Sequence, residues 1–106
     1  MSSAVPQRNT VTATGRSGKT YSFTEYPIGT EFQSFGAVYM FLKGRDPVYV
    51  GQTGDMSERF DDHHKADCIR RRGATVICVL AVSSEAERLA IERDLLMASY
   101  TWPCNG

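Results

Sequence analysis

The sequence lacks a net charge and a long hydrophobic run. Its 106 residues include 12 basic and 12 acidic side chains, so the formal charges cancel. Proteins that simply coat nucleic acid rely on an excess of Lys and Arg, so this balance argues against that class while leaving room for a local basic patch. The longest apolar run, residues 75–82, has the length of a strand and is too short to cross a membrane.

Cysteine is also scarce, and no apolar segment stands near the start. The three cysteines, Cys68, Cys78 and Cys104, are odd in number and show no C-x-x-C spacing. We therefore expect no disulfide framework and a reducing compartment, which favours a cytoplasmic location. Residues 1–14 contain no apolar stretch of the kind found in a secretory signal.

The composition is that of one small globular domain. Hydrophobic residues make up 42% of the chain and charged residues 23%, which is ordinary for such domains, and a chain of this length is expected to form one domain. We divide it into an N-terminal extension, residues 1–35, and a main part, residues 36–106.

Alternation and turn residues predict the strands. Residues 10–14 and 19–24 flank a Gly-containing turn and predict a hairpin, and residues 26–35 read as a loop. Three more segments predict strands, the last of them buried on both faces: residues 37–42, 47–51 and 75–82. The expected fold class is α/β of the α+β type: a small, mainly antiparallel sheet of about three core strands flanked by helices, with an extra N-terminal β-hairpin.

Two capping-box patterns predict the helices. Asp55 with Glu58 predicts a helix over residues 56–66, and Ser84 with Glu87 predicts one over residues 84–99. Residues 68–72 favour a further short helical turn that Gly73 ends. On the last helix we expect the inner side to carry Ala86, Leu89, Ala90, Leu96 and Met97.

Register decides whether two tyrosines meet. Tyr39 and Tyr49 lie on neighbouring predicted strands, and they share a face of the sheet only if the connecting loop has an odd number of residues. The simplest such loop is Lys43-Gly44-Arg45, since three-residue hairpin loops are common. A four-residue loop would place the two side chains on opposite faces.

Further polar residues stand at helical positions. Arg59 and His63 are four apart and would share one face of their helix. Glu92 falls between Leu89 and Leu96 on the expected inner side, where a carboxylate costs free energy unless it is paired or bound to a metal.

Taken in order, these elements resemble the signature of the GIY-YIG endonuclease family. The resemblance covers about two thirds of the chain, roughly residues 36–105, and leaves the N-terminal hairpin outside. Each element alone is weak, but six in order at similar spacing are specific together. They are Ala37-Val38-Tyr39, Tyr49-Val50-Gly51-Gln52-Thr53, Arg59, His63, Glu92 and Asn105.

The resemblance implies a divalent-metal-dependent endonuclease that hydrolyses DNA phosphodiester bonds with Mg²⁺ or Mn²⁺. It implies that Tyr39 acts as base, that Tyr49 positions phosphate or water, and that Glu92 binds the metal. An ordinary tyrosine has a pKa of about 10, so the base would need a neighbouring cation or His63 to favour its ionised form.

The remaining residues of the resemblance have supporting roles. It implies that Arg59 contacts a phosphate oxygen, that His63 relays a proton or binds phosphate, and that Asn105 holds the site or the substrate. The sequence shows no separate DNA-recognition domain. We therefore expect low specificity for DNA sequence, or specificity supplied by a homodimer or a protein partner. No membrane partner is expected.

Each residue also has a simpler structural interpretation. The tyrosines could be aromatics that pack on the sheet, Arg59 could pair with Asp55 or Asp62, and Asn105 could be a turn residue. Glu92 could pair with Arg88 four positions earlier. His64 points away from His63 and is expected at the surface.

Two other features affect the functional interpretation. Many members of that family have Lys where this chain has Gln52, so a phosphate-neutralising charge is missing. Glutamine also occurs there in the family, and the resemblance makes Gln52 a candidate nucleic-acid contact. The basic cluster could follow a DNA backbone or be a solvated turn; it comprises Lys65, Arg70, Arg71 and Arg72.

Three alternatives to a free-standing nuclease stay open. The chain could be a catalytically silent module that keeps the fold and binds nucleic acid or protein, or it could be a toxin or effector nuclease with a protein partner. A zinc site from His63, His64 and Cys68 has no recognised ligand spacing.

Overall fold

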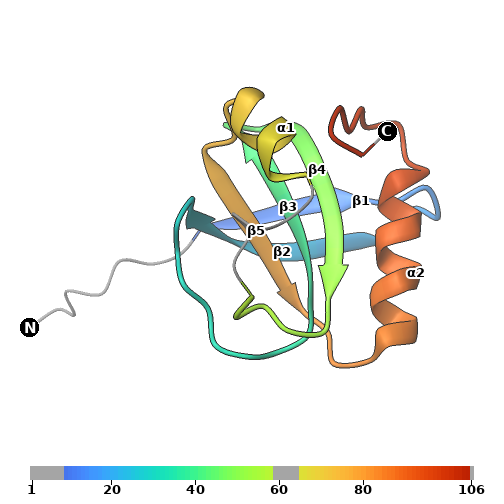
Figure 1. Ribbon diagram of the computed structural model, residues 1–106. Coiled ribbons are helices and arrows are strands. Elements are labelled where there is room, and N and C mark those ends of the chain that lie inside the picture. Colours follow the sequence, from blue (N-terminus) through green and yellow to red (C-terminus); the bar gives the residue numbers. More distant parts are fainter. Residues whose placement is uncertain (1–8, 59–64, 106) are drawn as a thin grey trace, which may run out of the picture.

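The computed structural model describes residues 9–58 and 65–105. In these ranges the chain forms one five-stranded sheet and two helices (Figure 1). Of the helices described, none has the length and apolar character needed to span a membrane. In chain order the elements are β1 Thr10–Thr14, β2 Thr20–Pro27, β3 Ala37–Lys43, β4 Asp46–Thr53, α1 Ala66–Arg71, β5 Val76–Ala81 and α2 Glu85–Leu96.

The strands are ordered β1-β2-β5-β3-β4, and every neighbouring pair is antiparallel. The predicted α+β class is therefore confirmed. The N-terminal hairpin joins the same sheet because β2 pairs with β5, so the sheet has five strands. β2 extends beyond the predicted residue 24 to Pro27, which is tolerated because only β5 pairs with the strand at that end.

The β3–β4 hairpin corrects the predicted loop. Lys43 pairs with Asp46, so the turn has two residues, and Gly44 adopts φ 61°, as expected for the first central residue of a type II′ turn. Such a turn alone would place Tyr39 and Tyr49 on opposite faces. A bulge between Phe41 and Leu42 inserts one extra residue on β4 and restores the register.

The consequence for the tyrosines is that the predicted shared face is confirmed. Tyr49 lies directly opposite Phe41, and Tyr39 lies opposite Gly51, two positions along the same face. The predicted register of Tyr39 and Tyr49 was correct because of the bulge, and not because the loop has an odd number of residues.

The helix expected over residues 56–66 is wrong at its start. Met56 to Glu58 form a turn and a bend, residues 59–64 lie outside the described ranges, and α1 begins at Ala66. The capping box does not form because Glu58 Oε1 accepts a hydrogen bond from Thr53 Oγ1 at 3.1 Å, while Asp55 Oδ1 accepts one from Ser57 N at 2.9 Å. α1 is the short helix expected at residues 68–72.

α2 begins as predicted but presents a different face. Ser84 Oγ accepts a hydrogen bond from Glu87 N at 3.2 Å, and the helix ends at Leu96 instead of residue 99. The residues expected inside are exposed at the surface: Ala86, Leu89, Ala90, Leu96 and Met97. Arg88 and Leu95 are buried instead. Apolar residues occur on both sides of this helix, so their pattern does not define the inner face.

The sheet carries an apolar core on each face. One core contains the tyrosine pair and Ile69 of α1, and the other contains Leu95 of α2 and Trp102. β5 contributes Ile77 and Val79 to the first and Cys78 to the second, so the prediction of a strand buried on both faces is confirmed.

The N-terminal hairpin also fixes α2. The Asp94 carboxylate accepts hydrogen bonds from Ser17 N at 2.9 Å, Ser17 Oγ at 2.6 Å and Tyr21 Oη at 2.7 Å. These bonds hold the pKa of Asp94 below its ordinary range. The hairpin outside the family resemblance thus anchors the helix that carries Glu92.

A disulfide joins Cys68 and Cys104, with their Cα atoms 5.8 Å apart. The expectation of no disulfide is wrong, because the fold brings together two cysteines 36 positions apart and neither an odd count nor spacing reveals this. Cys78 remains a buried thiol, and burial raises its pKa to about 12. The bond removes one of the reasons for expecting a reducing compartment.

Candidate active site

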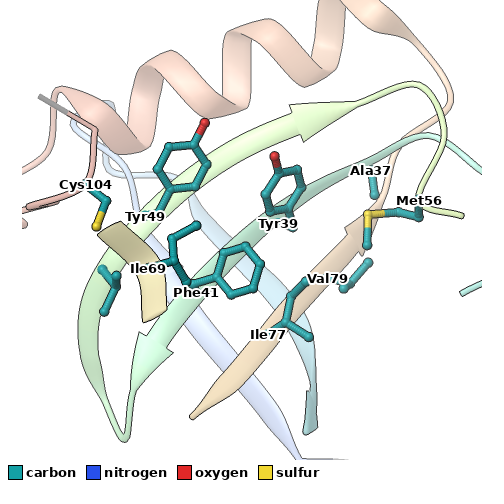
Figure 2. Packing of buried hydrophobic residues seen from close by; sticks show 10 residues of the cluster. Ala37, Tyr39, Phe41, Tyr49, Met56, Ile69, Ile77, Val79 and Cys104 are labelled. Atoms are coloured by element: carbon teal, nitrogen blue, oxygen red, sulfur yellow. The ribbon is translucent and has the colours of Figure 1, made fainter. Parts of the chain in front are cut away.

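The centre of the site is the tyrosine pair. Tyr39 on β3 and Tyr49 on β4 have ring centroids 6.2 Å apart, with an angle of 34° between the ring planes. Both rings are buried, and both hydroxyl groups point in the same direction, toward α2 (Figure 2). The rings pack on the sheet as the structural interpretation expects, but their polar ends converge.

Gly51 provides the space for this pair. A Cβ atom on Gly51 would lie 2.7 Å from Tyr39 Oη and 2.9 Å from Tyr49 Cε2, which is closer than real Cβ atoms approach. Its φ is not in the left-handed region, so close approach alone requires glycine here. The glycine of the Tyr49-Val50-Gly51 triplet therefore has a local physical cause.

Both phenols stay neutral at ordinary pH. Burial is the largest cause that raises the pKa of Tyr39, followed by the charges of Tyr49 and Glu92 and a hydrogen bond to Tyr49. Burial and the charge of Glu92 also raise the pKa of Tyr49. In this environment the phenols are hydrogen-bond donors, and Tyr39 can act as a base only if the negative charge nearby is compensated.

Glu92 approaches the pair from α2. Its charge acts on both phenols, so the three side chains share one neighbourhood. The carboxylate is partly buried, which raises its pKa, and among the described residues it has no hydrogen bond or ion pair. Leu89 and Leu96 are exposed and do not bury it, contrary to expectation.

These properties fit a hard cation. Mg²⁺ and Mn²⁺ take oxygen ligands, often one carboxylate together with waters and substrate phosphate, and a cation would offset the cost of a partly desolvated carboxylate. Within residues 9–58 and 65–105 no group of three His, Cys, Asp or Glu side chains could hold a metal ion. A cation beside Glu92 would therefore not be held by three such side chains from these ranges.

Asn105 holds the strand that carries Tyr49. Its Oδ1 accepts a hydrogen bond from Val50 N at 2.9 Å, and its Nδ2 donates one to Val50 O at 2.8 Å. Because both ends of the amide bind backbone, Asn105 positions β4 between Tyr49 and Gly51. It is neither a simple turn residue nor a free substrate contact.

The neighbouring Cys104 strengthens this attachment. Cys104 N donates to Val48 O at 3.0 Å, on the bulge residue, and the disulfide ties the same residue to α1. Sequence reasoning missed this contribution, since no local pattern indicates which cysteines pair.

Arg88 does not form the ion pair with Glu92 that the simpler structural interpretation offers. Its Nε donates to Gln52 Oε1 at 3.0 Å, and its Nη1 donates to Val82 O at 3.0 Å and to Ser83 O at 2.9 Å. Gln52, expected as a nucleic-acid contact, is therefore oriented by a buried arginine. The sequence could have suggested Arg88 only through its spacing from Ser84 and Glu92 on one helix face.

The remaining predicted residues fall into two groups. Arg59, His63 and His64 lie outside the described residues. Lys65 is partly buried before α1, and three arginines on and after α1 are exposed: Arg70, Arg71 and Arg72. Arg70 pairs with Asp67 at 2.6 Å on the surface, an interaction that contributes little to stability. Cys68 is in the disulfide and cannot serve as a zinc thiolate, which removes the zinc alternative.

The site thus brings together Tyr39, Tyr49, Glu92 and Asn105, from two strands, one helix and the segment after it. Comparison of the chain with protein-family models, with curated proteins and with solved structures gives no match.

Proposed function

We propose that this chain is a GIY-YIG-type endonuclease that hydrolyses DNA phosphodiester bonds with a divalent metal ion. The observation that supports the proposal best is the convergence of two buried phenols on one partly buried carboxylate that lacks a described partner. A structural core does not need such a carboxylate, and its ionised form destabilises the core.

In this proposal Glu92 holds Mg²⁺ or Mn²⁺, which when bound stabilises negative charge on the phosphoryl oxygens and on the leaving 3′ oxygen. Burial is the largest cause of the raised pKa of Tyr39, and neutralising Glu92 removes one of the further causes. Tyr39 can then take a proton from the water that attacks in line with the leaving oxygen. Tyr49 donates a hydrogen bond to the phosphate or to that water.

Two residues of the proposal come from the sequence alone. Arg59 contributes a guanidinium that stabilises charge on the phosphate, and His63 accepts the proton from Tyr39. In this proposal Asn105 keeps Tyr49 in position through its hydrogen bonds to the backbone of Val50 and does not contact the substrate. The substrate is DNA cleaved with low intrinsic sequence specificity, and a homodimer or a protein partner supplies any selectivity.

A plasmid-nicking assay tests the proposal. Wild type should convert supercoiled plasmid to the open circle with Mg²⁺ or Mn²⁺ and not with EDTA. Glu92→Gln, Glu92→Ala and Arg59→Ala should each lower the rate at least about a hundredfold, the size of effect seen when one charge-stabilising group is removed. Glu87→Gln is the matched control, because Glu87 is exposed on the same helix. Nicking that resists EDTA, or that survives in the Glu92 and Arg59 variants, contradicts the proposal.

A second function is favoured by the electrostatics of the pair. Both phenols have raised pKa values, chiefly because they are buried, so both resist the ionisation that a base requires. A catalytically silent module that binds nucleic acid or protein would tolerate this. Salt-sensitive DNA binding without turnover in any divalent metal would support that function over the nuclease.

A further inference from the structure

Within the part of the chain that the structure describes, Arg88 is a buried cation without an acidic partner. It is 7% exposed, and its described acceptors are one side-chain amide and two backbone carbonyls, all of them neutral. The ion pair found in the described ranges joins Arg70 to Asp67, on another helix. Burial of an uncompensated charge costs free energy, and the neutral acceptors offset that cost only in part.

A structural role explains part of this arrangement. Nη1 satisfies the carbonyls of Val82 and Ser83 where β5 passes into α2, and Nε fixes Gln52. Gly36 packs so tightly against the guanidinium that a Cβ there would lie 2.4 Å from Nη1. A neutral donor could make the same hydrogen bonds, so these bonds do not explain why a charged guanidinium with a further nitrogen, Nη2, stands here.

Nη2 is the group that can meet a ligand. None of the hydrogen bonds in the described ranges involves Nη2. In these ranges every fully buried side-chain nitrogen has a hydrogen-bond partner, so Nη2, which has none, keeps some access to solvent. It faces Gly54, where a Cβ atom would lie 3.6 Å away. Gly54 is exposed, and the nitrogen is therefore approached from the surface beside the end of β4.

Gln52 adds a second donor beside it. A guanidinium can only donate, so the amide of Gln52 must turn its oxygen toward Arg88 and its NH₂ group away. Gln52 is partly exposed and follows Gly51, and Arg88 precedes Glu92 by one helical turn. Because side chains alternate along a strand, Gln52 points to the face of the sheet that carries Val50, opposite the face of Tyr49.

We propose that Arg88 and Gln52 together bind a backbone phosphate of the DNA beside the end of β4. Arg88 supplies the charge and a free N–H, and Gln52 supplies an oriented NH₂ group. This contact positions the strand without reading its sequence, and it replaces the cation that a lysine at residue 52 would provide. The identity of the ligand rests on the proposed function.

Gln52→Glu tests the contact with little change of shape. The new carboxylate pairs with Arg88 Nε, compensates the buried charge and withdraws the donors, so the melting temperature should rise while DNA binding weakens. Gln33→Glu is the matched control, because it adds the same charge at an exposed loop residue. Gly54→Ala is the second variant: it leaves every bond of Arg88 in place and adds a methyl group over Nη2.

Binding is measured by fluorescence anisotropy of a short labelled duplex in EDTA, over a range of salt concentrations, so that no cleavage intervenes. Loss of one phosphate contact should reduce the slope of log K against log salt by about 0.9 for duplex DNA. That reduction is expected for Gln52→Glu relative to Gln33→Glu, and Gly54→Ala should bind more weakly than wild type at unchanged stability.

The outcomes separate the two proposals. If Gln52→Glu and Gln33→Glu lose the same slope, or Gly54→Ala binds like wild type, the phosphate contact is refuted whether or not the protein nicks plasmid. Absence of any binding by wild type at low salt also refutes it. If the slopes change as expected but no divalent metal supports nicking, the phosphate contact stands and the nuclease proposal fails.

Discussion

Substitution of Gly51 by alanine tests the geometry of the tyrosine pair directly. By strand preference alone, alanine should stabilise β4 by about 0.5–1 kcal/mol, since glycine loses more backbone freedom on folding. The added methyl group, however, would lie 2.7 Å from Tyr39 Oη and 2.9 Å from both Tyr39 Cζ and Tyr49 Cε2. Both rings are buried and cannot swing freely away, so the contact should cost about 1–3 kcal/mol.

The net expectation is a loss of roughly 0–2.5 kcal/mol, centred near 1 kcal/mol, or a fall in melting temperature of roughly 5 °C at that centre for a domain of this size. Gly54→Ala, whose nearest contact is 3.6 Å, should stay within about 0.5 kcal/mol of wild type. In a Tyr39→Phe background the closest contact disappears, so Gly51→Ala should cost about 0.5–1 kcal/mol less. Urea denaturation of wild type, the three single variants and the double variant measures all of these free-energy differences. If Gly51→Ala is more stable than wild type, as strand preference alone predicts, the tyrosine rings do not lie over Gly51 as described.

Three further perturbations have defined outcomes. Burial raises the pKa of Glu92 in the folded state. Its carboxyl therefore stabilises the fold below the unfolded pKa of about 4.3, and this contribution is lost as the pH rises through the folded pKa. Glu92→Gln should melt at a higher temperature than wild type at pH 7 without metal, and the difference should vanish near pH 4. Asn105→Asp keeps the acceptor for Val50 N but sets a carboxylate oxygen against Val50 O, which should cost about 1–2 kcal/mol in urea denaturation; an unchanged midpoint would refute the attachment. Replacing Cys68 and Cys104 by serine opens a link across 36 positions and should lower the unfolding free energy by roughly 4 kcal/mol, whereas a loss below about 1 kcal/mol would show that the segment is held without the bond.

The sheet could be predicted because its signals are local. Alternation and turn residues located all five strands to within a few positions, and Ser84 with Glu87 located the start of α2. The shared face of Tyr39 and Tyr49 was also predicted, but through a three-residue loop. At the bulge that produces it, Val48 O accepts a hydrogen bond from Cys104 N, far along the chain, and no local pattern encodes this contact.

The parts of the site that the sequence did not reveal depend on tertiary contacts. Leu89 and Leu96 predicted the wrong inner face of α2, because Arg88 and Leu95 are the buried residues. Arg88 donates a hydrogen bond to Gln52, and the carbonyl of Leu95 accepts one from Trp102. The Cys68–Cys104 bond and the steric need for Gly51 likewise follow from which elements meet in space. Tyr39, Tyr49, Glu92 and Asn105 could be named in advance only because their order resembles a known signature.

The segment from Trp102 to Asn105 has a consequence for how copies of this protein behave toward one another. β4 is an outer strand, and such strands offer unpaired N–H and C=O groups that recruit a strand from another molecule. Here Cys104 and Asn105 occupy the polar groups of Val48 and Val50 on that open side. The bond to α1 keeps this cover in place, so reduction of the disulfide should favour self-association along β4 and, in concentrated samples, aggregation.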